Sequence, residues 1–116
     1  MNHQENITNT ILTHHLTAFG NNSIKEIISD YCEESTLLTV SREIKGLRAI
    51  EDFFIELFSL IPKGSSFTMK KSTIKDNIAY IVWESKNQIN ETYSGSDTFI
   101  IEDNKIKYHT LIMHKK

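Results

Sequence analysis

Residues Glu91–Lys107, ETYSGSDTFIIEDNKIK, decide the fold. Alternating apolar and polar residues up to Ile101 predict a long strand, Asp103–Asn104 predicts a tight turn, and the following residues begin another strand. Asp97 lies on the same side of the first strand as Phe99 and Ile101. Because a carboxylate among apolar neighbours must be paired, hydrogen-bonded or protonated, we expect Asp97 to face a pocket. The plainer alternative is a structural carboxylate bonded to a neighbouring strand or an arginine.

The same period of two residues runs through the whole second half of the chain. The joins between the runs are short and consist of Asp, Asn and other turn residues, so successive strands form antiparallel hairpins. The expected meander of four strands comprises Phe67–Lys75, Ile78–Lys86, Glu91–Ile101 and Lys105–His114.

The first half carries helical patterns with a short hairpin between the second and third helices. Ser23 and Glu26 form a capping-box pattern that opens the second helix; this helix is expected to stop near Cys32 and to bury Tyr31. The three helices are Glu5–Phe19, Ser23 to about Cys32 and Leu47–Ile61, and the hairpin is Ser35–Val40 with Arg42–Lys45. Helices covering one face of a sheet give an α+β layer architecture, here one domain over residues 1–116.

Composition excludes several classes of function. The net charge is −2 and the positive charges are scattered, which argues against a nucleic-acid partner. No signal peptide and no membrane-spanning run is recognisable, so we expect a cytoplasmic protein without a membrane partner. Cys32 is the only cysteine, so no intramolecular disulfide can form.

Three polar side chains are candidates for chemistry in the pocket: Asp97, His15 on the apolar face of the first helix, and His109 on the last strand. Apolar surroundings disfavour the charged form of a carboxyl group, and a protonated aspartic acid can donate a hydrogen bond to a developing oxyanion. No close histidine spacing supports a metal site, and we expect no cofactor. The predicted ligand pocket comprises Phe19, Tyr31, Phe54, Leu57, Trp83, Asp97, Phe99 and His109.

The chain resembles the SnoaL-like branch of the nuclear transport factor 2-like superfamily. No single piece carries the resemblance; the order of the pieces across nearly the whole chain does. They are His14–Phe19, Ser29–Tyr31, Lys45–Ile50 before Phe53–Phe54, Ala79–Trp83, and Asp97–Phe99 followed by Asp103–Ile106. The resemblance implies a ketosteroid isomerase-like, cystatin-like cone, with a curved, mostly antiparallel sheet wrapped on three helices around a cavity. It also implies homodimers that pair through the sheet.

The resemblance implies site residues as well. The oxyanion-binding aspartic acid of ketosteroid isomerase falls on Asp97, its oxyanion-binding tyrosine on His15, and its proton-shuttling aspartate at or near Thr39. Because a threonine hydroxyl cannot act as that base near neutral pH, classical isomerase activity is not expected. Two hypotheses remain: a binding domain for a small apolar or aromatic molecule, or a cofactor-independent isomerase, lyase or polyketide cyclase-like enzyme using Asp97 with His15 or His109. A protein-interaction module is the weaker third.

Overall fold

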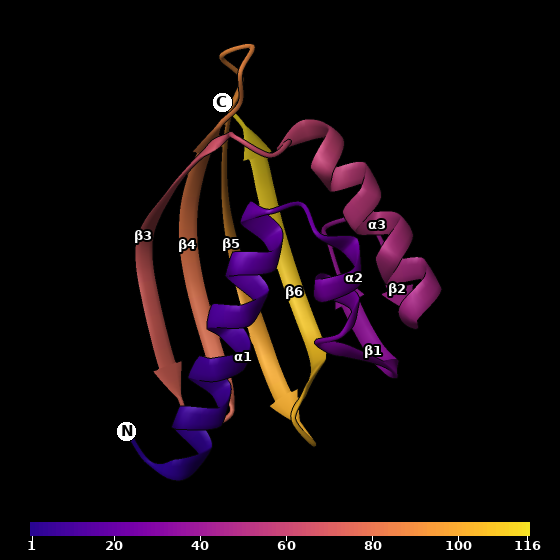
Figure 1. Ribbon diagram of the computed structural model, residues 1–116, viewed down its shortest axis with the longest axis vertical. Coiled ribbons are helices and arrows are strands. Elements are labelled where there is room, and N and C mark those ends of the chain that lie inside the picture. The colour runs from indigo at the N-terminus through magenta and orange to yellow at the C-terminus, as the bar shows by residue number, and fades with distance from the viewer.

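A computed structural model describes all 116 residues as one layer of three helices against one sheet of six strands (Figure 1). The expected α+β class is confirmed. The helices are α1 (His3–Gly20), α2 (Ile24–Ile28) and α3 (Leu47–Leu60). The strands are β1 (Tyr31–Leu38), β2 (Glu43–Lys45), β3 (Ser66–Lys75), β4 (Ile78–Lys86), β5 (Thr92–Glu102) and β6 (Lys105–Lys115).

Each helix begins at a recognisable local signal. Asn2 and Glu5 form a capping box at the start of α1, in which each side chain satisfies a backbone amide that the helix leaves free. The side chain of Ser23 accepts a hydrogen bond from the amide of Glu26 at the start of α2, as predicted. Helix α3 follows Gly46, whose φ of +88° suits glycine because other residues are strained there.

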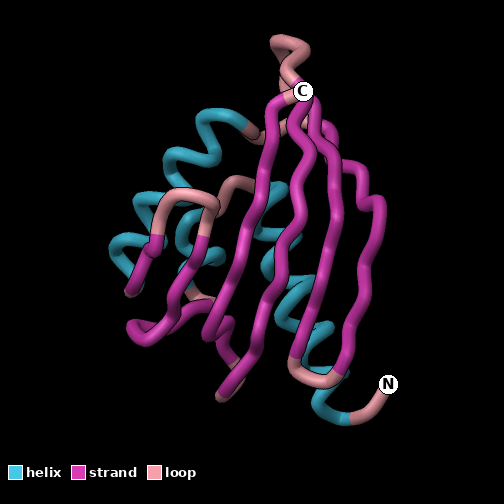
Figure 2. Tube along the Cα trace, turned by 180° about the vertical axis from the view of Figure 1, so that it is seen from behind, coloured by secondary structure: helices cyan, strands magenta, loops and turns pink.

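The sheet runs in the order β2-β1-β6-β5-β4-β3. The predicted antiparallel meander of β3 to β6 is confirmed, and β1 pairs antiparallel with β2. The sequence did not predict that β1 pairs in parallel with β6. This pairing places β6, the last strand along the chain, in the middle of the sheet. Seen from behind, the sheet curves, and the face turned to the viewer carries no helix (Figure 2).

The second helix is shorter than predicted, and Tyr31 does not belong to it. Helix α2 ends at Ile28, and Tyr31 is the first residue of β1. The carbonyl of Asp30 accepts a hydrogen bond from the amide of Ile106 in β6. The backbone at this point is therefore committed to the sheet, which overrides the helical spacing of the apolar residues. Tyr31 remains buried, but against the sheet.

The core lies between the helices and the inner face of the sheet. Residues of β4 alternate between buried and more exposed, with Ala79, Ile81 and Trp83 facing inward. Helix α1 contacts β3 and β4, whereas α3 contacts β1 and β2 and buries Phe53, Phe54 and Leu57 in the same core. No helix combines the length and the apolar character that crossing a membrane requires.

Candidate functional site

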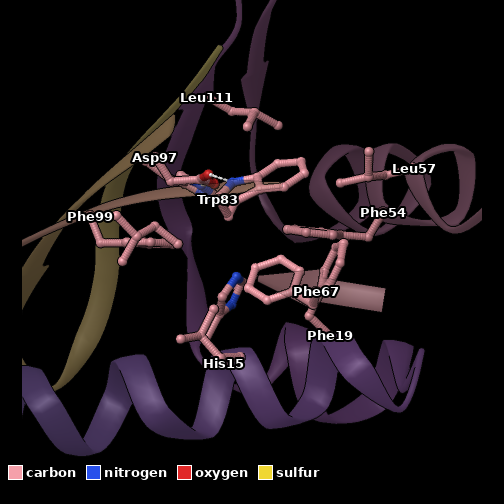
Figure 3. Close-up of a pocket in the computed structure, with 12 residues that line it drawn as sticks. His15, Phe19, Phe54, Leu57, Phe67, Trp83, Asp97, Phe99 and Leu111 are labelled. Carbon is pink, nitrogen blue, oxygen red and sulfur yellow. Dashed lines mark hydrogen bonds and ion pairs between the residues drawn. The ribbon is translucent and has the colours of Figure 1, made fainter. Parts of the chain in front are cut away.

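A small cavity lies between α1, α3 and the inner face of the sheet (Figure 3). Nine of its twelve lining residues are hydrophobic, and the space open to the centre of a water molecule is about 20 Å³, which is room for about one water. The lining residues are His15, Leu16, Phe19, Phe54, Leu57, Phe67, Ile81, Trp83, Asp97, Phe99, His109 and Leu111.

Both carboxylate oxygens of Asp97 have partners inside the protein. Oδ1 accepts a hydrogen bond of 2.6 Å from the indole N–H of Trp83, and Oδ2 lies 2.6 Å from Nε2 of His109. The indole and the imidazole thus occupy one carboxylate oxygen each. The prediction that Asp97 faces inward is confirmed by its 7% exposure, and its immediate partners are an indole and an imidazole.

His109 continues this arrangement to Tyr31. Its Nδ1 lies 2.8 Å from the Tyr31 hydroxyl, and burial together with the nearby Asp97 charge raises the pKa of Tyr31 well above its usual value. The hydroxyl therefore keeps its proton and can donate it to Nδ1, which leaves the proton of a neutral His109 on Nε2, facing Asp97. We call Trp83, Asp97, His109 and Tyr31 the buried polar chain.

His15 is the polar group of the cavity that lacks a partner. It is 3% exposed, and its Nδ1 makes no hydrogen bond although it is buried. Its ring packs edge-on against Phe99, with 5.0 Å between ring centres, and against Phe54, at 5.8 Å. Burial, helped by the neighbouring His109, lowers the pKa of His15 well below its ordinary value. His15 therefore stays neutral near pH 7 and offers one donor and one acceptor.

Gly95 allows the buried polar chain to form. It lies opposite Trp83 in the β4–β5 pair, and a Cβ at Gly95 would come within 2.4 Å of the indole Cζ2 atom. Without that Cβ, the indole lies across Gly95 and its N–H reaches Asp97, two residues along β5. The sequence placed Gly95 and Asp97 on one face but did not reveal this role.

The structure brings most of the predicted site residues together. Of the eight predicted pocket residues, seven line the cavity. The eighth, Tyr31, does not line it but bonds to His109, which does. Thr39 lines a different hollow, beside Arg42 and Phe53, where its hydroxyl accepts a hydrogen bond from the amide of Arg42. The position that the resemblance gave to an isomerase base is thus not in this cavity.

Four lining residues did not enter the predicted pocket: Leu16, Phe67, Ile81 and Leu111. Ile81 and Leu111 could have been predicted from the expected meander, because they are the residues paired with Asp97 on its two neighbouring strands. Phe67 had a weaker signal because it lies near the start of the edge strand β3, whose residues are mostly exposed.

A second histidine cluster reaches inward from the surface, from the exposed Glu26 through His14 to Asp30, which is only 8% exposed. Nδ1 of His14 is 2.8 Å from Asp30 and Nε2 is 2.9 Å from Glu26. These hydrogen bonds, that to Asp30 first, raise the pKa of His14. Burial raises the pKa of Asp30, and the bond from His14 offsets part of that effect. We call Glu26, His14 and Asp30 the surface cluster. No group of His, Cys, Asp or Glu side chains is arranged to bind a metal ion.

Comparison with solved structures shows the fold. A candidate ketosteroid isomerase from Kribbella flavida superposes with a TM-score of 0.80 at 13% identity, over 96% of this chain and 80% of that one. An NTF2-like protein of unknown function from Mesorhizobium loti gives 0.80 at 13%, over 98% and 96%. A candidate polyketide cyclase from Sinorhizobium meliloti gives 0.69 at 14%, over 88% and 93%.

No protein-family model and no curated protein matches the chain in sequence. The expected NTF2-like, cystatin-like cone is nevertheless confirmed at the level of the fold. Such a likeness carries no activity with it, because one fold serves many functions.

Proposed function

We propose that this protein is a small-molecule-binding domain whose cavity accepts a small apolar or aromatic ligand. The observation that carries the proposal is the unpartnered Nδ1 of His15 in a mostly apolar cavity, whose two other polar side chains, Asp97 and His109, are bonded to each other. A buried polar atom without a partner is unfavourable, so a ligand with a matching polar group gains by supplying one. Apolar walls with a few fixed polar groups are typical of ligand sites.

The geometry favours binding over acid–base catalysis. Asp97 is engaged by Trp83 and His109 through both oxygens, so neither oxygen is free to contact an oxyanion. The pKa of His15 is lowered, which makes its imidazole a weak base near neutral pH. An isomerase, lyase or cyclase reaction through these residues would first have to break the buried polar chain.

The test is a binding screen of small apolar and aromatic compounds, read by NMR. Trp83 is the only tryptophan, so its single indole N–H signal reports on the cavity. We expect ligands to shift this signal, and His15→Phe to weaken the binding of polar ligands at unchanged stability. His3→Phe, an exposed position on the same helix, is the matched control. A screen in which no compound moves the Trp83 signal contradicts the proposal.

A second proposal concerns the helix-free face of the sheet, which we infer forms a homodimer interface. This outer face exposes large apolar side chains from three strands, β1, β4 and β6: Leu38, Ile78, Tyr80, Tyr108 and Ile112. The outward residues between them on β5, from Ser94 to Ile100, carry no charge. Exposed apolar side chains gathered on one face, with uncharged residues between them, are typical of association sites.

Light scattering coupled to gel filtration tests the dimer. We expect Ile112→Lys to convert a dimer into a monomer because it places a charge at the centre of the apolar face. Ile89→Lys, in the exposed loop between β4 and β5, is expected to leave the mass unchanged. A wild-type protein that is monomeric at all accessible concentrations rules the interface out.

A further inference from the structure

Phe67 closes the cavity from the side of the sheet edge. It is the second residue of β3, the edge strand, and it is 40% exposed, which is high for a phenylalanine that also lines a cavity. Its ring lies 5.5 Å from that of Trp83 at an angle of 22°, and 6.3 Å from that of Phe19. In Figure 3 its ring lies beside that of Phe19, on the side towards His15.

A second hollow lies on the other side of Phe67. It measures about 100 Å³ and shares Leu16, Phe19 and Phe67 with the cavity. Its far rim is polar, with Asn22, Ser65 and Ser66. Phe67 therefore forms part of the partition between a small inner space that holds the unpartnered histidine and a larger outer one.

The two stacked rings are held very differently. The Trp83 indole is fixed by its hydrogen bond to Asp97 and by its close fit over Gly95. Phe67 has no polar anchor, and its strand has no neighbour on one side. Rotation of the Phe67 side chain towards solvent would leave a flat, rigid indole face uncovered.

We infer that a monocyclic phenolic ligand exchanges places with the ring of Phe67, stacks on Trp83 and bonds to His15. This inference rests on the proposed function and names its ligand class. A cavity of about 150 Å³ binds benzene, and the hollows of about 20 and 100 Å³ joined by the volume of a displaced phenyl ring reach that size.

The hydroxyl group follows from the state of His15. A neutral imidazole presents one donor and one acceptor, and a hydroxyl can accept from the first or donate to the second. It therefore matches the unpartnered Nδ1 in either tautomer. A purely apolar ring would leave this atom unsatisfied, and an anionic ligand would lie near the Asp97 carboxylate.

The experiment compares phenol with toluene, a ring of similar size without a hydroxyl, by calorimetry and by the Trp83 indole N–H signal. In Phe67→Ala the stacking place is already open, so we expect phenol to bind at least about tenfold more tightly than in the wild type. Phe67→Leu, which keeps an apolar plug, is the control and should resemble the wild type. Should Phe67→Ala fail to fold, Phe67→Val replaces it.

A hydrogen bond to His15 should favour phenol over toluene about tenfold in Phe67→Ala, and His15→Phe in that background should abolish the preference. Equal binding of phenol by wild type and Phe67→Ala, with other compounds still shifting Trp83, overturns the exchange but leaves the proposed function standing. Equal binding of phenol and toluene overturns the hydroxyl contact. Failure of every compound in both proteins overturns the proposed function too.

Discussion

The surface cluster and the buried polar chain each hold a histidine between two side-chain oxygens. His14 contacts two carboxylates, and a protonated imidazole can donate to both, so the bonds to Asp30 and Glu26 raise its pKa. His109 contacts one carboxylate and one hydroxyl that keeps its proton, so a neutral imidazole satisfies both partners. The second partner makes the difference: a carboxylate, Glu26, gives His14 an ion pair, and a hydroxyl, Tyr31, gives His109 a buried hydrogen-bond chain.

Burial also gives two neighbouring histidines very different pKa values. His14 and His15 are adjacent on α1, yet the pKa of His14 is raised and that of His15 is lowered. One points to the carboxylates of the surface cluster, the other into a core of aromatic rings. Two sequence neighbours on one helix therefore have pKa values shifted in opposite directions, so their contributions to stability change with pH in opposite ways.

The largest expected effect comes from removing the central acceptor of the buried polar chain. Asp97→Ala leaves the Trp83 and His109 donors without a partner in the core, and we expect a loss of about 3–5 kcal/mol in the free energy of unfolding. Glu26→Ala in the surface cluster should lose about 1 kcal/mol or less. Urea denaturation measures both. Equal losses would mean that the core repacks around the missing carboxylate.

A smaller loss of stability is expected when the buried polar chain is disturbed at Gly95, over which the Trp83 indole lies. In Gly95→Ala the new Cβ meets the Trp83 indole, and we expect a loss of about 1–3 kcal/mol with a changed indole N–H signal. Gly20→Ala, where no atom lies within 4 Å of the added Cβ, is the control and should be neutral or slightly stabilising. An unchanged indole signal in Gly95→Ala would show that Gly95 does not position Trp83.

The free energy of unfolding should depend on pH in the acid range because of His15. The pKa of folded His15 is lowered from an unfolded value of about 6.5, so the unfolded state binds more protons below that pH. Stability should fall by about 1.4 kcal/mol for each pH unit below 6.5, until the folded pKa is reached. His15→Phe should be less sensitive to acid than the wild type. Identical acid profiles would contradict a neutral, buried His15.

The smallest effect should appear at alkaline pH and have the opposite sign. The pKa of folded His14 is raised, so its contribution is complete below about pH 6.5 and is lost as the pH rises through the folded pKa. Because His14 is partly solvated, we expect at most about 1 kcal/mol. His14→Gln should flatten this slope in thermal unfolding between pH 6 and 9, and salt should do the same. A slope that persists in His14→Gln must come from another group.

Much of the fold was readable because its signals are local. The period of two residues located the meander, and Phe99 and Ile101 placed Asp97 on the inner face. The helical pattern predicted a helix over Leu47–Ile61, and α3 spans Leu47–Leu60. These patterns depend on residues a few positions apart, which the sequence shows directly.

The partners of the site residues were not readable because they come from distant strands. Tyr31 and His109 are 78 positions apart and meet only because β1 pairs in parallel with β6. The Trp83–Asp97 bond depends on strand register and on the flat indole over Gly95. No local pattern reports either contact, so the sequence could nominate Asp97 without identifying what holds it.

The position of β6 in the middle of the sheet has a consequence for folding. Strands β3, β4 and β5 can assemble from neighbouring hairpins, whereas β1 and β2 join the sheet only through β6. Non-local pairings of this kind slow folding. During synthesis on the ribosome, the α1-to-α3 segment therefore has no sheet to dock on fully until β6 has emerged. Substitutions at the β1–β6 seam should slow refolding more than those between β3 and β4.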